Sequence, residues 1–189
     1  WFPVPELGQV NHEARIRAER IRIPEPAIDS LKGYVGKALH EISGYSKPEL
    51  DGIVIGLSGG IDSTATAALC KEALSGTRHF VRGLIMGRAP EGQQGSMNAV
   101  EYQDVMFAIQ SAKDMGVDYE YVDISPLVDA VHQVFPKSQP WELSGILPRL
   151  RASLLYQAAD NNNAICAGTT NGTEFILAAF SVGGPAGHF

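Results

Sequence analysis

Residues 52–63 read GIVIGLSGGIDS, an apolar run followed by two consecutive glycines. The first six residues have the length and composition of a buried β-strand. A mostly apolar stretch of helical length follows the glycines, over residues 64–74. The segment therefore predicts a strand, a glycine turn and a helix, in that order.

The same alternation of strands and helices continues along the rest of the chain. The predicted strands are short apolar runs, at 52–57, 80–86, 119–124 and 164–167. The predicted helices lie at 28–42, where apolar residues recur every three or four positions, and at 64–74, 97–115, 127–135, 147–159 and 173–180. Such alternation is typical of parallel strands joined by right-handed crossovers. We therefore predict an α/β fold, a doubly wound parallel sheet with helices on both faces, and a ligand site in the loops after Leu57, Met86 and Ala167.

Composition excludes several classes of protein. The chain has 189 residues with 15 basic and 21 acidic side chains, and this net charge of −6 argues against binding nucleic acid mainly through phosphate contacts. No apolar run is long enough for a membrane helix. We expect one domain over 27–189, preceded by a proline- and arginine-containing arm over 1–26. Because the chain starts at Trp1 rather than Met, we expect it to be a trimmed piece of a longer protein.

The two cysteines, Cys70 and Cys166, both lie within apolar stretches. Two cysteines cannot form a disulfide framework or a cysteine-rich zinc site, and this favours a reducing, cytoplasmic location. We predict that both are core thiols without a nucleophilic role.

The turn after the first predicted strand has the residues of an anion-binding loop. Gly59 and Gly60 allow the backbone to approach a bulky anion, and Ser63 and the following helix N-terminus add donors and a favourable dipole. A carboxylate beside phosphates requires a cation between them, so Asp62 is a candidate magnesium ligand. The alternative is an ordinary helix-capping aspartate. The loop lacks both the lysine of the Walker phosphate loop and the G-x-G-x-x-G spacing of dinucleotide-binding folds.

The segment S-G-G-I-D-S after an apolar strand resembles the pyrophosphate loop of the ATP pyrophosphatase superfamily, also described as adenine nucleotide alpha hydrolase-like. Members of this superfamily cleave ATP between its α and β phosphates, adenylate a substrate and release pyrophosphate. The resemblance implies that ATP is contacted by residues of this strand and loop, namely Gly56, Ser58, Gly59, Gly60, Asp62 and Ser63.

A second segment, GTTNGTE at 168–174, resembles the G-T-x-N-x-x-E segment of NAD synthetases. In that family the threonine, here Thr169, meets ATP, and the glutamate, here Glu174, completes the magnesium site. The resemblance thus implies that Asp62 and Glu174 hold one Mg²⁺ and act together in catalysis. The alternative for Glu174 is a carboxylate that interacts only with the dipole of the helix that it starts.

Two further segments resemble the same family. The run GILPRLRASLLY at 145–156 is similar to the family's G-N-x-x-A-R-x-R-x-x-x-L-Y helix, and it implies that Arg149 and Arg151 reach substrate phosphates. The alternative is that both are exposed helix arginines. GLIM at 83–86 resembles the second strand, whose end, at Met86, lies against the adenosine. The likeness extends from about residue 27 to residue 180.

The resemblance implies an ammonia-dependent NAD synthetase-like ligase. Such an enzyme adenylates the nicotinate carboxylate of nicotinate adenine dinucleotide with ATP and Mg²⁺, releases pyrophosphate, and lets ammonia displace AMP to give NAD. The family also implies a homodimer, and the helices at 28–42 and 147–159 are candidate interfaces. The other interpretation of their apolar faces is the domain core. From the composition we expect a cytoplasmic protein with neither nucleic-acid nor membrane partners.

Some positions depart from the family pattern. Gly145 stands where the family has asparagine, Pro148 where it has alanine, and residues 181–189 lack the lysine, tyrosine and aspartate of F-T-K-Y-G-D-G. We expect this last segment to be mobile and to govern acid specificity, and a lysine-bearing continuation is expected beyond it. Alternatives therefore remain: the same chemistry on a different carboxylic acid, a tRNA-thiolating or GMP-forming relative, or a non-catalytic ATP- or AMP-binding homologue.

Overall fold

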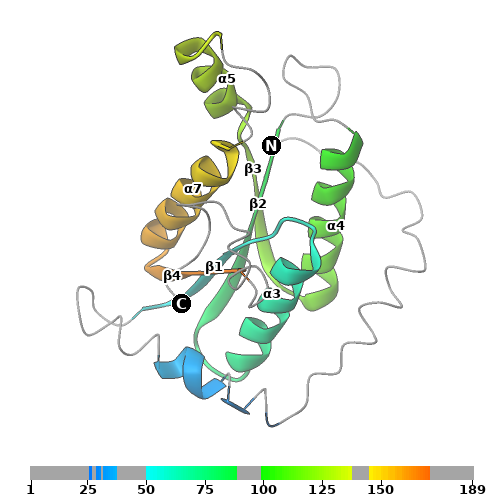
Figure 1. The fold of residues 1–189 in the computed structure, drawn as a ribbon. Helices are drawn as coiled ribbons and strands as arrows, with labels where there is room; N and C mark the ends of the chain where they lie inside the picture. Colours follow the sequence, from blue (N-terminus) through cyan, green and yellow to red (C-terminus); the bar gives the residue numbers. More distant parts are fainter. Residues whose placement is uncertain are drawn as a thin grey trace.

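A computed structural model describes residues 26, 29–30, 32–37, 50–88, 99–137 and 145–170. Within this part of the chain, a four-stranded sheet has the order β3-β2-β1-β4, and each neighbouring pair is parallel (Figure 1). The strands are β1 (Gly52–Gly56), β2 (Phe80–Gly87), β3 (Asp118–Asp123) and β4 (Ala164–Ala167). The numbered helices with complete bounds are α3 (Ile61–Ala73), α4 (Ala99–Met115), α5 (Ser125–Val134) and α7 (Leu147–Asn161).

Helices cover both faces of this sheet. In β1, Ile53 and Ile55 belong to the apolar cluster that includes residues of α3 and α4, whereas Val54 packs with Leu155 of α7 on the other face. This alternation follows from the period of two in a strand, which sends successive side chains to opposite faces. Figure 1 shows α3 and α4 on one side of the strands and α7 on the other. The predicted doubly wound parallel sheet is confirmed.

The strand order reverses direction at β1. The chain goes from β1 to β2 and β3 on one side, and then returns to place β4 against the other edge of β1. In open parallel sheets, the loops that leave the strands on either side of such a reversal separate and leave a crevice at the carboxyl ends. The glycine loop after β1 and the Thr169 segment after β4 both lie at this point.

Helix α3 begins earlier than the sequence predicted, at Ile61 rather than residue 64. Gly60 is its N-cap in an extended conformation (φ −80°, ψ 163°), and its carbonyl accepts the first helical hydrogen bond from the amide of Thr64, at 3.2 Å. Asp62 and Ser63 therefore belong to the first turn of the helix. The early start brings their side chains and backbone amides into one rigid element.

Other predicted bounds differ by a few residues or fall outside the described residues. Helix α5 begins at Ser125 rather than 127, with a proline in its first turn, where the missing N–H costs nothing. The described residues 29–30 and 32–37 of the predicted first helix are helical, and Val35 is part of the core. The predicted helix at 173–180 lies outside the described residues. Across the described ranges, none of the helices has the length and apolarity to cross a membrane.

Candidate active site

A cavity of about 310 Å³ lies at the carboxyl ends of the strands. Residues from both sides of the strand-order reversal line it, and helices α4 and α7 contribute side chains from opposite faces of the sheet. These lining residues include Gly56, Ser58, Met86, Glu101, Arg151 and Thr169. Five of them are predicted site residues, so the structure brings together segments that are more than 100 positions apart in the sequence.

The loop after β1 is held together by its own serines. The hydroxyl of Ser63, a residue only 3% exposed, accepts a hydrogen bond from the amide of Ser58 at 3.2 Å and donates one to the carbonyl of Gly60 at 3.1 Å. The amide of Gly60 in turn donates to the hydroxyl of Ser58 at 3.3 Å. Ser63 thus stabilises the loop through these hydrogen bonds. The first backbone amides of α3 have no intrahelical acceptor, so they are the donors best placed to bind an anion.

Gly59 lies where the loop passes closest to α4. Its φ is +83°, a conformation that favours glycine. A Cβ atom at this position would lie 2.2 Å from the backbone oxygen of Asp104. The loop and α4 are therefore in direct backbone contact, and the sequence prediction of a close-approach glycine is explained by this neighbour.

Asp62 lies in the first turn of α3 with an exposed side chain. Among the described residues, no three His, Cys, Asp or Glu side chains form a group that could hold a metal by themselves. Magnesium suits such a place, because it uses one or two carboxylates and takes its other ligands from phosphates and water. The donor set therefore fits a Mg²⁺ that binds with a polyphosphate. Glu174, the predicted second ligand, lies outside the described residues.

The structure separates the two predicted substrate arginines. Arg151 lines the cavity, and so does Pro148. Arg149 is exposed; its Nη1 donates to the carbonyl of Gly145 at 2.9 Å, and it is absent from the cavity lining. Arg149 is thus exposed outside this cavity lining and Arg151 is part of it, while the predicted contact of either arginine with a substrate phosphate stays a prediction.

Sequence reasoning missed an ionic cluster at the cavity. Glu101 of α4 accepts hydrogen bonds from Arg88 Nε at 3.0 Å and Nη2 at 2.6 Å, and it faces Arg151 Nη2 at 3.9 Å. The sequence contained one signal for this cluster: Glu101 lies one helical turn before Val105, on the face of α4 that Val105 and Ala108 bury in the core.

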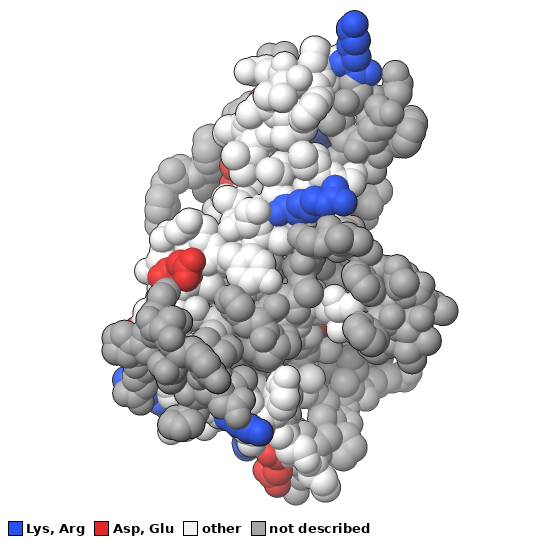
Figure 2. Space-filling view, turned by 60° about the vertical axis from the view of Figure 1, so that its left-hand side comes forward, with Lys and Arg blue, Asp and Glu red and all other residues white. Residues whose placement is uncertain are grey.

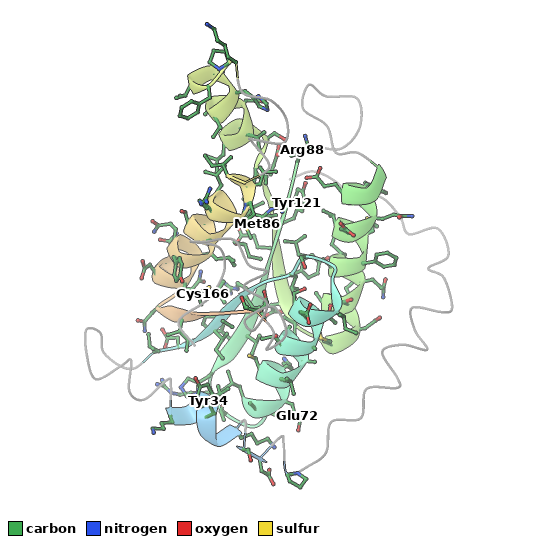
Figure 3. The ribbon with its side chains drawn as sticks, in the orientation of Figure 1. Tyr34, Glu72, Met86, Arg88, Tyr121 and Cys166 are labelled. Atoms are coloured by element: carbon green, nitrogen blue, oxygen red, sulfur yellow. The ribbon has the colours of Figure 1, made fainter. Side chains whose placement is uncertain are left out.

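Tyr121 joins this cluster from β3. Its hydroxyl donates to the carbonyl of Arg88 at 2.8 Å, while burial, together with Asp123 and Glu101, raises the pKa of Tyr121 to about 12. Figure 3 shows Met86, Arg88 and Tyr121 at the same end of the sheet, between α7 and α4. The hydrogen bonds that Arg88 donates to Glu101 raise the pKa of Arg88, so this guanidinium stays charged.

Both cysteines are buried, as predicted. Burial raises the pKa of the Cys70 and Cys166 thiols to about 11, so neither forms a thiolate near neutral pH.

On the face shown in Figure 2, the described Lys and Arg side chains stand apart from one another instead of forming a continuous basic stripe.

Comparison with known proteins agrees with this arrangement. The sequence profile of the NAD synthase family matches residues 34–187. An NH(3)-dependent NAD(+) synthetase from Pyrobaculum aerophilum is 35% identical over 139 residues, which cover 72% of this chain and 48% of that protein. One from Thermococcus kodakarensis is 35% identical over 156 residues, covering 82% and 54%. The chain thus spans about half the length of the curated relatives it matches.

A solved structure shares the fold. The NH3-dependent NAD synthetase from Campylobacter jejuni, in complex with the nitrate ion, superposes with a TM-score of 0.66 at 28% identity, covering 86% of this chain and 65% of that one. The described parallel sheet is therefore part of a fold that this chain shares with a solved NAD synthetase.

Proposed function

The chain belongs to the NAD synthase family, and from this premise we propose that it is an ATP-dependent amide ligase that converts nicotinate adenine dinucleotide and ammonia to NAD. The observation that carries the proposal is the shared cavity. Ser58 of the pyrophosphate-type loop, Thr169 of the second family segment and Arg151 all line one space of about 310 Å³.

The proposed reaction has two steps in this cavity. First, an oxygen of the nicotinate carboxylate attacks the α-phosphorus of ATP, the bond to the β-phosphate oxygen breaks, and pyrophosphate leaves. Ammonia then attacks the acyl carbon, the bond from that carbon to the AMP oxygen breaks, and the nitrogen loses a proton. AMP leaves with one oxygen of the former carboxylate. Adenylation thus replaces a carboxylate oxygen, which is a poor leaving group, with AMP, which is a good one.

The chain's own groups have distinct parts in this scheme. The amides at the start of α3 bind the β- and γ-phosphates, where the helix dipole stabilises negative charge. Thr169 contacts ATP beside them, and Met86 packs against the adenosine. Arg151 neutralises a substrate phosphate. These donors are fixed before the reaction, which is the condition under which they stabilise charge on the departing pyrophosphate most effectively.

Magnesium completes the proposed site. Asp62, together with Glu174 of the segment at 168–174, would hold the ion against the polyphosphate. Bound there, Mg²⁺ neutralises charge that develops on the leaving pyrophosphate. The exposed position of Asp62 at the helix start supports this part of the proposal.

Pyrophosphate release over a panel of carboxylic acids tests the proposed function. With ATP, Mg²⁺ and an ammonium salt present, nicotinate adenine dinucleotide should give the highest kcat/KM. A higher value for another acid would favour the second candidate, the same chemistry on a different substrate. The departure that favours this candidate is Pro148, which lies in the cavity lining. No release with any acid would contradict both.

We predict that this chain uses ammonium ions and not glutamine as its nitrogen donor. A glutaminase requires an activated cysteine nucleophile, and both cysteines of this chain are buried with thiol pKa values raised to about 11. NAD formation measured by chromatography should therefore require an ammonium salt. Turnover of the isolated chain with glutamine alone, at a rate similar to that with ammonium, would contradict this prediction.

We further propose the setting in which this reaction takes place. The chain comprises an arm over 1–26 and the catalytic domain over 27–189, and it acts as a homodimer in the cytoplasm. Both cysteines are buried and no disulfide joins them, which supports a reducing compartment. For the interface, Leu155 and Ala159 of α7 pack against the sheet, so this part of the candidate surface belongs to the core.

A further inference from the structure

We propose that Glu101 is a positioning residue, which holds the guanidinium of Arg151 at the cavity so that it binds a phosphate group of a nucleotide substrate. The inference rests on the proposed function, since that function brings two phosphate-bearing molecules to this site: ATP and nicotinate adenine dinucleotide. It adds a role for Glu101 and Arg88, to which the sequence motifs assign none.

The two carboxylate oxygens of Glu101 have different partners. Oε2 accepts both hydrogen bonds from Arg88, at 3.0 Å from Nε and 2.6 Å from Nη2. Oε1 faces Nη2 of Arg151 at 3.9 Å, which is an ion pair rather than a hydrogen bond. Arg88 thus fixes the carboxylate, and the fixed carboxylate attracts Arg151 without occupying its N–H donors.

Three elements meet in this cluster. Arg88 follows β2, Glu101 is on α4 and Arg151 is on α7, which packs on the opposite face of the sheet. Their side chains are partly buried, with 28%, 18% and 35% of their surface exposed, respectively. Figure 3 shows Arg88 beyond the end of β2, between α4 and α7. Partial burial limits solvent screening, so the ion pairs retain orienting force.

Arg151 also has an unused donor. Its Nε is buried and has no hydrogen-bond partner among the residues that the structure describes. Buried donors are almost always satisfied by protein, water or ligand. Because Arg151 and Glu101 both line the cavity, a ligand in the cavity is the natural acceptor. The cluster of two guanidinium groups and one carboxylate carries a net positive charge, while Asp104 adds a further carboxylate to the cavity lining. The unpartnered donor of Arg151 therefore marks the place for an anion, and phosphate oxygens match the fork of an arginine.

Removing the charge of Glu101 has two opposite consequences. Loss of the negative charge would strengthen the attraction of the cluster for an anion. Loss of the orienting partner would let Arg151 sample other rotamers, and restricting it again when the ligand binds would cost entropy and weaken the affinity. A positioning role predicts that the second effect is larger. The direction of the change in affinity therefore distinguishes positioning from a simple charge effect.

Calorimetric titration of the full-length protein tests the proposal, with ATP, nicotinate adenine dinucleotide and adenosine as separate probes. Glu101→Gln should weaken binding of the nucleotide that contacts Arg151 by about tenfold, the scale of immobilising one arginine side chain. Glu101→Asp keeps the charge but shortens the reach, so it should also weaken this binding. Adenosine, which has no phosphate, should bind unchanged. The probe that responds identifies the source of the phosphate.

Two controls make the test specific. Glu72→Gln removes an exposed helix carboxylate that pairs with Lys32 at 3.7 Å, away from the cavity lining, and should leave all three affinities unchanged. In an Arg151→Met background, Glu101→Gln should have almost no further effect, because residues that act through one another are not additive. Thermal unfolding of each variant confirms that it is folded.

Tighter or unchanged nucleotide binding by Glu101→Gln, or an equal loss of adenosine binding, would overturn the positioning role. An undiminished effect in the Arg151→Met background would overturn it as well. These outcomes leave the proposed function intact as long as the wild-type protein releases pyrophosphate with its acid. A wild-type protein that binds neither nucleotide would contradict the proposed function and this inference together.

Discussion

Asp62→Asn should lower the rate of pyrophosphate release by about a hundredfold or more, the scale for removing one stabiliser of developing charge. The replacement keeps the side-chain size and removes the charge that would bind Mg²⁺. Because the Asp62 side chain is exposed in the first turn of α3, the fold should survive. Glu174→Gln should have a similar effect if the two carboxylates share one ion. Exchange of labelled pyrophosphate into ATP, with the acid present, measures the step directly.

The double variant should be scarcely worse than either single one, because groups that act as a unit are not additive. Raised Mg²⁺ should partly restore the single variants, since a weakened site fills by mass action. Asp129→Asn, which removes an exposed carboxylate of α5, is the matched control and should exchange at the wild-type rate. Wild-type exchange by Asp62→Asn would rule out the shared-ion mechanism.

Gly59→Ala should lower kcat/KM for ATP by about a hundredfold, the effect of an ångström-scale displacement of a reacting group. The added Cβ would lie 2.2 Å from the backbone oxygen of Asp104, so the loop and α4 have to move apart. Because alanine is strained at the φ of +83°, the substitution should also lower the free energy of unfolding by about 1–2 kcal/mol. Steady-state kinetics with varied ATP and a denaturant titration measure the two effects separately.

Gly76→Ala is the matched control for this change. Gly76 also has a positive φ, +75°, but a Cβ there meets nothing within 4 Å. It should therefore lose stability through backbone strain alone and retain its activity. If Gly59→Ala kept a wild-type kcat/KM for ATP, the contact between the loop and α4 would have no part in shaping the site.

The elements that were predictable from the sequence are those encoded by local patterns. The run before Ser58 is apolar because α3 and α4 cover one face of β1 and α7 covers the other. Gly59 and Gly60, which follow Ser58, indicate the turn. The start of α3 was misplaced because Gly60 acts as an N-cap through its backbone alone, with no side-chain hydrogen bond that would identify it in a sequence. Local pattern thus predicts the elements and leaves their ends uncertain.

The arginines show where local reasoning could have gone further. Residues two positions apart on an α-helix point in directions about 200° apart, so Arg149 and Arg151 leave α7 on nearly opposite sides. Helical geometry alone therefore predicts that the two arginines have different surroundings, although not which one lines the cavity. The packing of α7 on β4 and β1 makes the choice, and this is tertiary information.

Glu101 was unpredictable for a related reason. Its partners are 13 and 50 positions away in the sequence, and they meet it only because the sheet places the end of β2 between α4 and α7. A glutamate in a predicted helix is most often a solvated residue, so only the structure shows that this one lies in the cavity.

The fate of one oxygen atom tests the central claim, that this cavity adenylates the nicotinate carboxylate, most directly. The wild-type protein is incubated with ATP, Mg²⁺, an ammonium salt and nicotinate adenine dinucleotide whose carboxylate carries ¹⁸O at both positions. Mass spectrometry of the released nucleotide should find one ¹⁸O in each AMP, because the carboxylate oxygen that attacks the α-phosphorus leaves with it. Unlabelled AMP, or ADP and phosphate in its place, would contradict the account.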